Sequence, residues 1–221
     1  DGHPVDIDQA GNQTMIVGNL IFVDQNGDGI IDWKDQVVIG QSGMPKWNFS
    51  TFTSFKWKNW SIDALFQGAT GYTVNFGDAA GYGGISGHQS VAKKYQFENR
   101  SLLGANGDIE VLRKFPPAFT TGGLPQSDTR SNDFTKIDAF YLRLKTLNIT
   151  YNLPKSLTSS LGLDYVQVYG SGSNVFTLDN FDVYSGSYDP EIITSAGDGG
   201  GGVDRAYPNV RTWTAGLKVG F

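Results

Sequence analysis

The C-terminal segment, residues 210–221, constrains the fold of this chain more than any other part of it. Its residues alternate in type, which predicts a β-strand because successive side chains of a strand point to opposite faces. One face is mostly apolar and the other is small or polar. The first face carries Arg211, Trp213, Ala215, Leu217, Val219 and Phe221. Such a strand suits the half-buried edge of a soluble sandwich or the wall of a membrane β-barrel, where a terminal aromatic lies at the membrane boundary.

The composition favours the barrel and excludes several other classes. Charged residues make up 18% of the chain, against about 25% in an ordinary soluble protein. The 29 glycines and 13% aromatic residues are typical of an all-β chain with many turns. No apolar run approaches the roughly 20 residues of a membrane helix, so any membrane crossing must use strands. The absence of cysteine excludes disulfides and thiolate metal sites, and the net charge of -5 argues against a nucleic-acid partner.

Four further segments alternate over about ten residues, the length that a tilted membrane strand requires. They are residues 46–57, 60–68, 141–153 and 165–178. Trp47 and Trp57 bracket the apolar face of the first, which forms a hairpin with the second. In the fourth, one face is predicted to carry Val166, Val168, Gly170, Gly172, Phe176 and Leu178. Near Arg143 and Lys145 the phase of the alternation flips, which indicates a bulge or a strand that leaves the lipid.

The connections between these segments alternate strictly between short and long. Residues 58–59 and 155–163 are short, whereas residues 69–138 and 179–209 are long. Outer-membrane barrels have short periplasmic turns and longer extracellular loops. This pattern predicts extracellular long loops, an extracellular segment 1–43 and a periplasmic C-terminus. Five strands cannot close a barrel, because bacterial single-chain barrels use an even number, about eight or more. We therefore expect residues 44–221 to form the last five strands of a larger antiparallel transmembrane barrel, incomplete on its own.

Residues 24–35, with the sequence DQNGDGIIDWKD, have the oxygen-ligand spacing of an EF-hand calcium loop. The predicted ligands are Asp24, Asn26, Asp28, the Ile30 carbonyl, Asp32 and Asp35. Asp35 is one methylene shorter than the usual bidentate Glu. Because strand-like rather than helical residues flank the loop, we expect a structural calcium clamp, with magnesium as the less suitable cation. The alternative is an Asn-Gly turn with solvated carboxylates.

Other candidate sites have simpler explanations. His3 and His88 stand alone, which is typical of solvated loop histidines. Asp189 and Glu191 flank Pro190 and resemble a glycosidase carboxylate pair only in composition, so a rigid turn is the preferred interpretation. The glycine run at 197–202 follows no strand and opens no helix, unlike a phosphate-binding loop. The loop aromatics either bind a sugar or a partner, or fill the core of their own loop; they are Tyr72, Phe76, Tyr82, Tyr95 and Phe97. We predict no catalytic residues.

A series of short motifs resembles the C-terminal part of the SusC/RagA family of TonB-dependent outer-membrane transporters. Each motif is weak alone, but together they run in order along nearly the whole chain. They are DQNGDGIID at 24–32, PKW at 45–47, FQG at 66–68, FYLRLK at 140–145, YNLPK at 151–155, GSNVFT at 172–177, YDPE at 188–191, YP at 207–208 and RT at 211–212.

The resemblance implies a barrel of about 22 strands filled by a plug domain. It also implies energy coupling to TonB through an N-terminal part, a SusD-like surface lipoprotein as partner, and import of oligosaccharides or peptides across the outer membrane. In this family the terminal strand belongs to the assembly signal, so Phe221, Trp213, Leu217 and Val219 become candidate signal residues.

Two other functions are compatible with some of these features. A secreted all-β binding module with a calcium-stabilised loop would share the strand pattern and the acidic loop, but would need no detergent to stay in solution. A surface hydrolase would rest on scattered carboxylates alone. An outer-membrane importer without enzymatic activity explains the most features, and we take it as the expectation.

Overall fold

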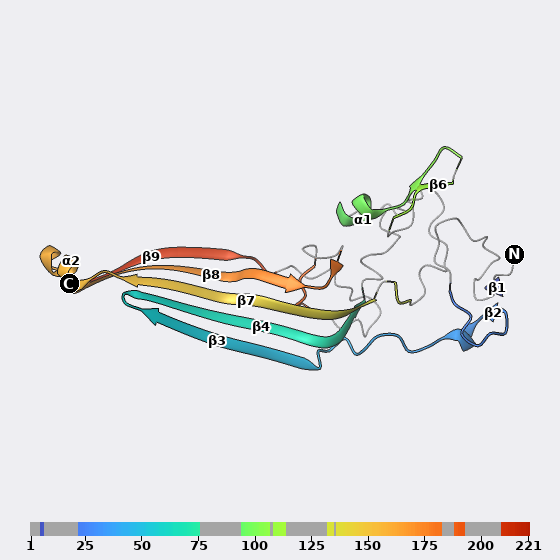
Figure 1. Ribbon diagram of the computed structural model, residues 1–221, viewed down its shortest axis with the longest axis horizontal. Helices are drawn as coiled ribbons and strands as arrows, with labels where there is room; N and C mark the ends of the chain where they lie inside the picture. Colours follow the sequence, from blue (N-terminus) through green and yellow to red (C-terminus); the bar gives the residue numbers. More distant parts are fainter. Residues whose placement is uncertain are drawn as a thin grey trace. The chain divides into compact units, whose positions relative to one another are not determined.

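The computed structural model describes residues 5–6, 22–75, 94–106, 108–113, 132–134, 136–182, 188–192 and 209–221. The main element of this part of the chain is a five-stranded sheet with the order β3-β4-β7-β8-β9 (Figure 1). Its strands are β3 (Trp47–Trp57), β4 (Trp60–Asn75), β7 (Lys136–Asn152), β8 (Tyr165–Asp179) and β9 (Thr212–Gly220). Strands neighbouring in the sheet follow one another along the chain, and the pairs β3–β4, β7–β8 and β8–β9 are antiparallel. The chain is therefore an all-β protein, as the alternation predicts.

The remaining elements are short. Strand β1 (Val5–Asp6) pairs in parallel with β2 (Ile30–Ile31), and β5 (Leu102–Leu103) pairs antiparallel with β6 (Ile109–Val111). The helical turns are η1 (Trp33–Asp35), α1 (Lys94–Asn99), α2 (Lys155–Thr158) and η4 (Ser159–Leu161). None of the helices in the described part of the chain is long and apolar enough to span a membrane.

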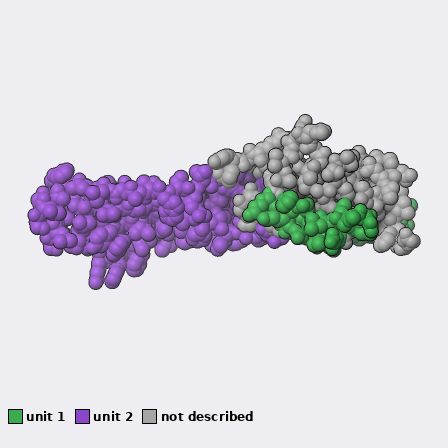
Figure 2. All heavy atoms as spheres, turned by 90° about the horizontal axis from the view of Figure 1, so that it is seen from above, with its two compact units in different colours: residues 1–41, 74–137, 194–205 green, residues 42–73, 138–193, 206–221 purple. Residues whose placement is uncertain are grey.

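The chain divides into two compact units (Figure 2). One consists of residues 1–41, 74–137 and 194–205, and includes the acidic loop. The other consists of residues 42–73, 138–193 and 206–221, and includes nearly all of the five-stranded sheet.

The first two strands form a tight hairpin. Trp57 pairs with Trp60, which leaves Lys58 and Asn59 as the turn. Lys58 has a φ of 51°, the positive value that two-residue hairpin turns require. Residues that pair directly share a face, so Phe55 lies beside Ile62 and Trp57 beside Trp60. Phe52, which pairs with Leu65, lies on the opposite face.

Apolar residues from each of the five strands lie on one side of the sheet, which we call the apolar face. The rings of Trp60 and Tyr151 lie 4.7 Å apart and join the β3–β4 hairpin to β7. In β7–β9 the same face is set by directly paired residues, among them Leu147, Gly172 and Trp213. The face is well exposed: Trp47 is 70% exposed, Trp213 62% and Leu217 61%. A soluble sheet would bury such a surface, whereas a barrel wall presents it to lipid.

A bulge interrupts the pairing of β7 with β8. Leu144 pairs with Phe176 and Thr146 with Ser173, so Lys145 faces two residues of β8, Asn174 and Val175. The extra residue of the bulge lies in β8, so β7 keeps its alternation and Arg143 stays on the same face as Leu147. The predicted change of phase in β7 is therefore a change of residue type along one face, from apolar to charged. Asn174 adopts a φ of 50°, a conformation that asparagine tolerates better than most residues.

The bulge corrects one sequence prediction. Phe176 and Leu178 were expected on the same face as Gly172. However, Gly172 pairs with Leu147 and Phe176 pairs with Leu144. Leu144 and Leu147 are an odd number of positions apart in β7, so they point to opposite faces. Phe176 and Leu178 therefore leave the apolar face, because the extra residue of the bulge shifts the alternation of β8 by one.

Two strands extend beyond their predicted bounds, so the first long connection is shorter than the expected 69–138. Strand β4 continues past Gly68 to Asn75, and β7 begins at Lys136 rather than near Tyr141. Gly71 has a φ of 76°, and this irregularity hides the extension from the alternation pattern. The buried side chains of the second unit gather at this end; they include Ala69, Tyr72, Ala139, Tyr141, Leu144, Phe181 and Tyr188.

Candidate functional site

Four charged side chains meet beyond the bulge and form what we call the Arg143 clamp, made of Arg143, Lys145, Asp189 and Glu191. Arg143 in β7 is 4% exposed, and its two terminal nitrogens lie 2.6 Å from Asp189 Oδ1 and 2.6 Å from Glu191 Oε2. Its Nε donates to Thr177 Oγ1 of β8 at 2.8 Å. Lys145 Nζ donates to both carboxylate oxygens of Glu191 at 2.6 Å. Two cations and two anions thus neutralise one another in a small volume.

The two carboxylates belong to a turn at 188–192 that is tied to several strands. Asp189 Oδ1 accepts from the Glu191 N–H at 3.0 Å, which fixes the turn around Pro190. The Tyr72 hydroxyl of β4 donates to the Pro190 carbonyl at 3.1 Å. Asn209, near the start of β9, donates its N–H to Asp189 Oδ2 at 2.8 Å and its Nδ2 to Glu191 Oε2 at 2.8 Å. The turn therefore links β4, β7 and the segment that enters β9.

The hydrogen bonds decide what these carboxylates can do. Burial raises the pKa of Asp189, but the hydrogen bonds from Arg143, Glu191 N–H and Asn209 N–H lower it by more, so its net pKa lies below the ordinary value. All four oxygens of Asp189 and Glu191 already accept hydrogen bonds. A general acid needs a carboxyl with a raised pKa and an oxygen that can reach the substrate. This geometry favours the rigid turn over the glycosidase-like pair.

The acidic loop at 24–35 is closed by its own backbone hydrogen bonds. Asp24 accepts from the N–H groups of Gly27 at 2.6 Å and Gly29 at 2.8 Å. Asp35 accepts from Gln25 at 2.8 Å with one oxygen and from Asp32 at 2.8 Å with the other. The same pattern holds for Asn26, Asp28 and Asp32, which accept from Asp28, Ile30 and Lys34. The loop has a defined shape that its carboxylates and amide maintain.

These contacts leave the metal interpretation as a prediction. Within the described residues, no three histidine, aspartate or glutamate side chains converge closely enough to hold a metal. The donor set of the loop is nevertheless hard oxygen, which suits calcium, and a carboxylate oxygen that accepts one N–H keeps a second lone pair. The hydrogen bond from the Asp32 N–H holds the pKa of Asp35 below its ordinary value, and those from Gln25 and Asn26 contribute further. Asp35 is therefore ionised at neutral pH, as a cation ligand must be.

The terminal strand β9 presents the predicted signal residues on the apolar face. Trp213, Leu217 and Val219 pair with Gly172, Val168 and Val166 of β8. Phe221 follows the strand and is 91% exposed. Among the described residues β9 has one hydrogen-bonded neighbour, β8, and its other edge is unpaired. An unpaired, strongly apolar edge strand is what the open end of a partial barrel wall presents.

Comparison with known proteins supports the expected family. Two curated proteins of Formosa agariphila align with almost the whole chain. TonB-dependent receptor P26 is 28% identical and is matched by 98% of the chain, and TonB-dependent receptor P3 is 29% identical and is matched by 92%. The resemblance to TonB-dependent receptors is thereby confirmed. The chain spans only about a fifth of these relatives, 21% and 19% of their lengths.

Solved structures agree with the fold of a TonB-dependent receptor barrel. The chain matches the RagAB peptide transporter with a TM-score of 0.57 and 22% identity, covering 93% of this chain and 20% of that one. A match to the RagAB peptide importer in the 'open-open' state has a TM-score of 0.54. At this identity the likeness concerns the fold, which is that of a barrel fragment. No family model matches the chain.

The sequence pattern alone did not predict the Arg143 clamp. At Arg143 and Lys145 the sequence indicated only a change in the alternation of apolar and polar residues. At Asp189 and Glu191 it indicated only a turn. A usable signal existed, because two cations on alternate positions of an apolar strand need anionic partners when the strand is buried. Asn209 gave no such signal, since an asparagine in a loop is common.

Several predicted features lie outside the described residues, namely His3, His88, Phe76, Tyr82 and the glycine run at 197–202. Of the loop aromatics that are described, Tyr72 is fully buried and bonds to Pro190. It fills the core of the turn rather than facing a ligand. Phe97 is 58% exposed, and the Arg100 guanidinium lies 3.9 Å from its ring centre.

Proposed function

We propose that this chain forms part of the barrel wall of a TonB-dependent outer-membrane transporter that imports nutrients. One observation carries the proposal: a sheet of strands that neighbour in sequence order exposes a continuous apolar face. Strand β3 has 11 residues and β9 has 9, which matches the roughly 9–11 residues of a tilted membrane strand. The similarity to TonB-dependent receptors supports the same function independently.

The proposed orientation follows from the connections. The tight turn at Lys58 and Asn59 and the short helical connection of α2 and η4 face the periplasm, together with Phe221. The long connections after β4 and β8 then face the cell exterior. In this arrangement the Arg143 clamp lies just outside the lipid and holds the last long connection against the strands.

The working transporter requires more than this chain. We propose that the rest of the barrel surrounds a plug domain, that TonB supplies energy through the N-terminal part, and that a SusD-like lipoprotein covers the extracellular face. The cargo class is an oligosaccharide or a peptide. The role of the chain is transport, not catalysis.

Phe221 and the apolar face of β9 act in assembly of the barrel. Deletion of Phe221 would then lower the yield of assembled barrel, and an unchanged yield would contradict this role.

The test uses the full-length protein in its native outer membrane. Cells with and without the gene, and cells lacking TonB, are compared for uptake of labelled peptides and labelled oligosaccharides. We expect uptake of one cargo class to require both the receptor and TonB. A full-length protein that stays monomeric in aqueous lysate without detergent would overturn the proposal.

A further inference from the structure

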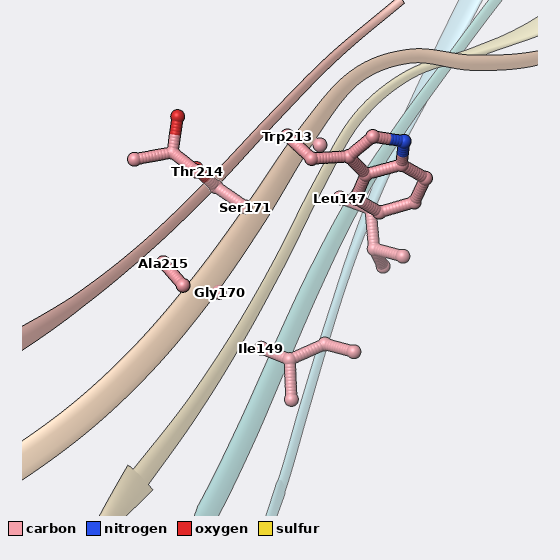
Figure 3. A pocket seen from close by; sticks show the side chains of 8 residues that line it. Leu147, Ile149, Gly170, Ser171, Trp213, Thr214 and Ala215 are labelled. Carbon is pink, nitrogen blue, oxygen red and sulfur yellow. The ribbon is translucent and has the colours of Figure 1, made fainter.

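The apolar face of β7, β8 and β9 contains a shallow groove (Figure 3). It encloses about 350 Å³ and is lined almost entirely by apolar atoms. This volume is comparable to that of a small ligand pocket, about 300–1,000 Å³. The apolar lining comes from Leu147, Ile149, Gly170, Gly172, Trp213 and Ala215. Since all three strands belong to this chain, the groove does not depend on the rest of the barrel.

Two glycines of β8 form the floor of the groove and have different roles. A Cβ on Gly172 would lie 2.7 Å from the Trp213 ring and 2.9 Å from Val175, so only glycine lets the indole lie against the sheet. A Cβ on Gly170 would meet nothing closer than the Thr214 carbonyl at 3.9 Å. The space above Gly170 is therefore open, while Leu147, Ile149 and Trp213 rise around it.

The groove lies toward one boundary of the proposed membrane span. From Trp213 to Phe221 the strand advances roughly 26 Å, which is about 20 Å along the membrane normal at the usual barrel tilt. The apolar band of such barrels is about 25 Å tall and is bordered by aromatic girdles. With Phe221 at the periplasmic boundary, Trp213 lies about 5 Å inside the outer one. The groove beside Trp213 then lies in the outer leaflet.

A cation stands at the boundary end of the groove. Arg211 is exposed and lies just before β9, two positions ahead of Trp213. If the alternation of β9 continues to this residue, Arg211 lies on the same face as Trp213. Among the described residues no carboxylate pairs with Arg211, whereas Arg143 and Lys145 are both neutralised by Asp189 and Glu191. An arginine at the lipid boundary can reach a phosphate and bind it with two parallel hydrogen bonds.

We infer that this groove binds one acyl chain of a phosphate-bearing membrane lipid, whose phosphate contacts Arg211. The inference rests on the proposed function, because it requires the apolar face to meet lipid. Two features fit this occupant: the apolar lining of the groove, and an exposed arginine near its Trp213 end that pairs with no carboxylate among the described residues. A second copy of the chain would fit the lining, but would need an anion of its own opposite Arg211.

The test is lipid binding to the full-length protein, delipidated in detergent and followed by native mass spectrometry. The probes are phosphatidylglycerol and a diacylglycerol with the same chains, which lacks the phosphate. The Gly170→Leu variant fills the groove, Gly170→Ala does so mildly, and Arg211→Gln removes the cation. Ala64→Leu is the matched control, because Ala64 lies on the apolar face of β4 away from the groove. A difference in electrophoretic migration between heated and unheated samples shows that each variant is an assembled barrel.

The outcomes separate the possibilities. Displacing about two methylenes of a bound chain should weaken phosphatidylglycerol binding about tenfold in Gly170→Leu, with a smaller loss in Gly170→Ala and none in Ala64→Leu. Arg211→Gln should weaken phosphatidylglycerol binding and leave diacylglycerol binding unchanged. Equal binding in wild type and Gly170→Leu would overturn the inference, as would a dimer that Gly170→Leu converts to monomer. A wild-type protein that never forms a heat-modifiable barrel would instead overturn the proposed function.

Discussion

At the level of one residue, Arg143 indicates where the sheet would leave the lipid in the proposed barrel. An arginine that faces the bilayer centre costs about 2–4 kcal/mol in a membrane barrel. Arg143 lies in the same strand as Leu147 and Ile149, yet it is 4% exposed and paired with Asp189 and Glu191. The guanidinium is therefore buried against protein, and in the proposed barrel the lipid boundary would lie between Arg143 and Leu147.

Removing the Arg143 side chain should release the turn at 188–192. Arg143→Ala would leave Asp189 buried without its cation, and breaking one partner of a buried pair costs about 3–5 kcal/mol. We expect faster proteolytic cleavage within residues 179–209 of the assembled protein. Arg100→Ala is the control, because Arg100 contacts Phe97 in an exposed position. Identical cleavage rates for both variants would show that the clamp does not hold the loop.

The clamp should also depend on pH in a predictable direction. Asp189 has a lowered pKa in the folded protein, so its contribution is fully present above the unfolded pKa and is lost as pH falls through the folded one. The stability difference between wild type and Asp189→Asn should be constant from about pH 5 to 7 and shrink below the ordinary carboxyl pKa, near 4. Thermal unfolding of both proteins across this range measures it. A difference that does not change with pH would contradict the assignment.

Calcium binding by the acidic loop remains a prediction, and so does the role of each predicted ligand. Isothermal titration of the full-length protein should show binding at or below millimolar calcium, the range of extracellular calcium sites, about 0.1–1 mM. Asp28→Asn keeps the acceptor for the Ile30 N–H and removes one charge, so it should weaken binding. Asp133→Asn, outside the loop, should not. The absence of heat at millimolar calcium would leave the loop as a self-contained turn.

At the level of elements, the bulge in β8 separates two regions of the sheet. On one side of Asn174 the apolar face meets solvent in the isolated chain and lipid in the proposed barrel. On the other side, Tyr141, Leu144 and Tyr188 are buried. The Asn174 Nδ2 group also donates to the Val210 carbonyl at 3.0 Å, which ties the bulge to the residues that lead into β9. Asn174 thus belongs to the bulge that shifts the alternation of β8, and it also holds the segment that leads into β9.

The conformation of Asn174 should limit its substitutions. Its φ of 50° costs a residue with a normal side chain about 1–2 kcal/mol, and a β-branched residue the most. We expect Asn174→Val to lower the temperature at which the heat-modifiable barrel unfolds, and Asn174→Gly to lower it less, since glycine loses only the Val210 hydrogen bond. Equal unfolding temperatures for the two variants would argue against a bulge at this position.

Regular elements could be predicted from this sequence better than irregular ones. The strand alternation around Trp57 and Trp213 predicts both pairing and face, because each side chain has one environment. The extension of β4 past Gly71 and the bulge at Asn174 break the period, so pattern alone assigns the wrong bounds to β4 and the wrong face to Phe176. The Arg143 clamp joins residues distant in sequence, and only the fold brings Asp189 and Asn209 to one place.

In the whole molecule, the proposed barrel wall has a lipid side and an inner side. The relatives are about five times longer, since the chain covers 21% of one and 19% of another. In the proposed barrel, the exposed apolar face is one part of a larger lipid-facing surface. Such a wall requires that adjacent residues of β9 meet lipid and water in alternation.

Spin labelling of the full-length protein in lipid vesicles measures this directly. Single cysteines are placed at Leu217 and at Lys218, neighbours that the alternation assigns to opposite faces, in a background without other reactive cysteines. We predict that a label at 217 collides with oxygen dissolved in lipid, and that a label at 218 collides with a water-soluble nickel reagent. The same periodicity should continue to Trp213 and Thr214. Water-soluble reagent reaching both positions equally would contradict the transmembrane barrel.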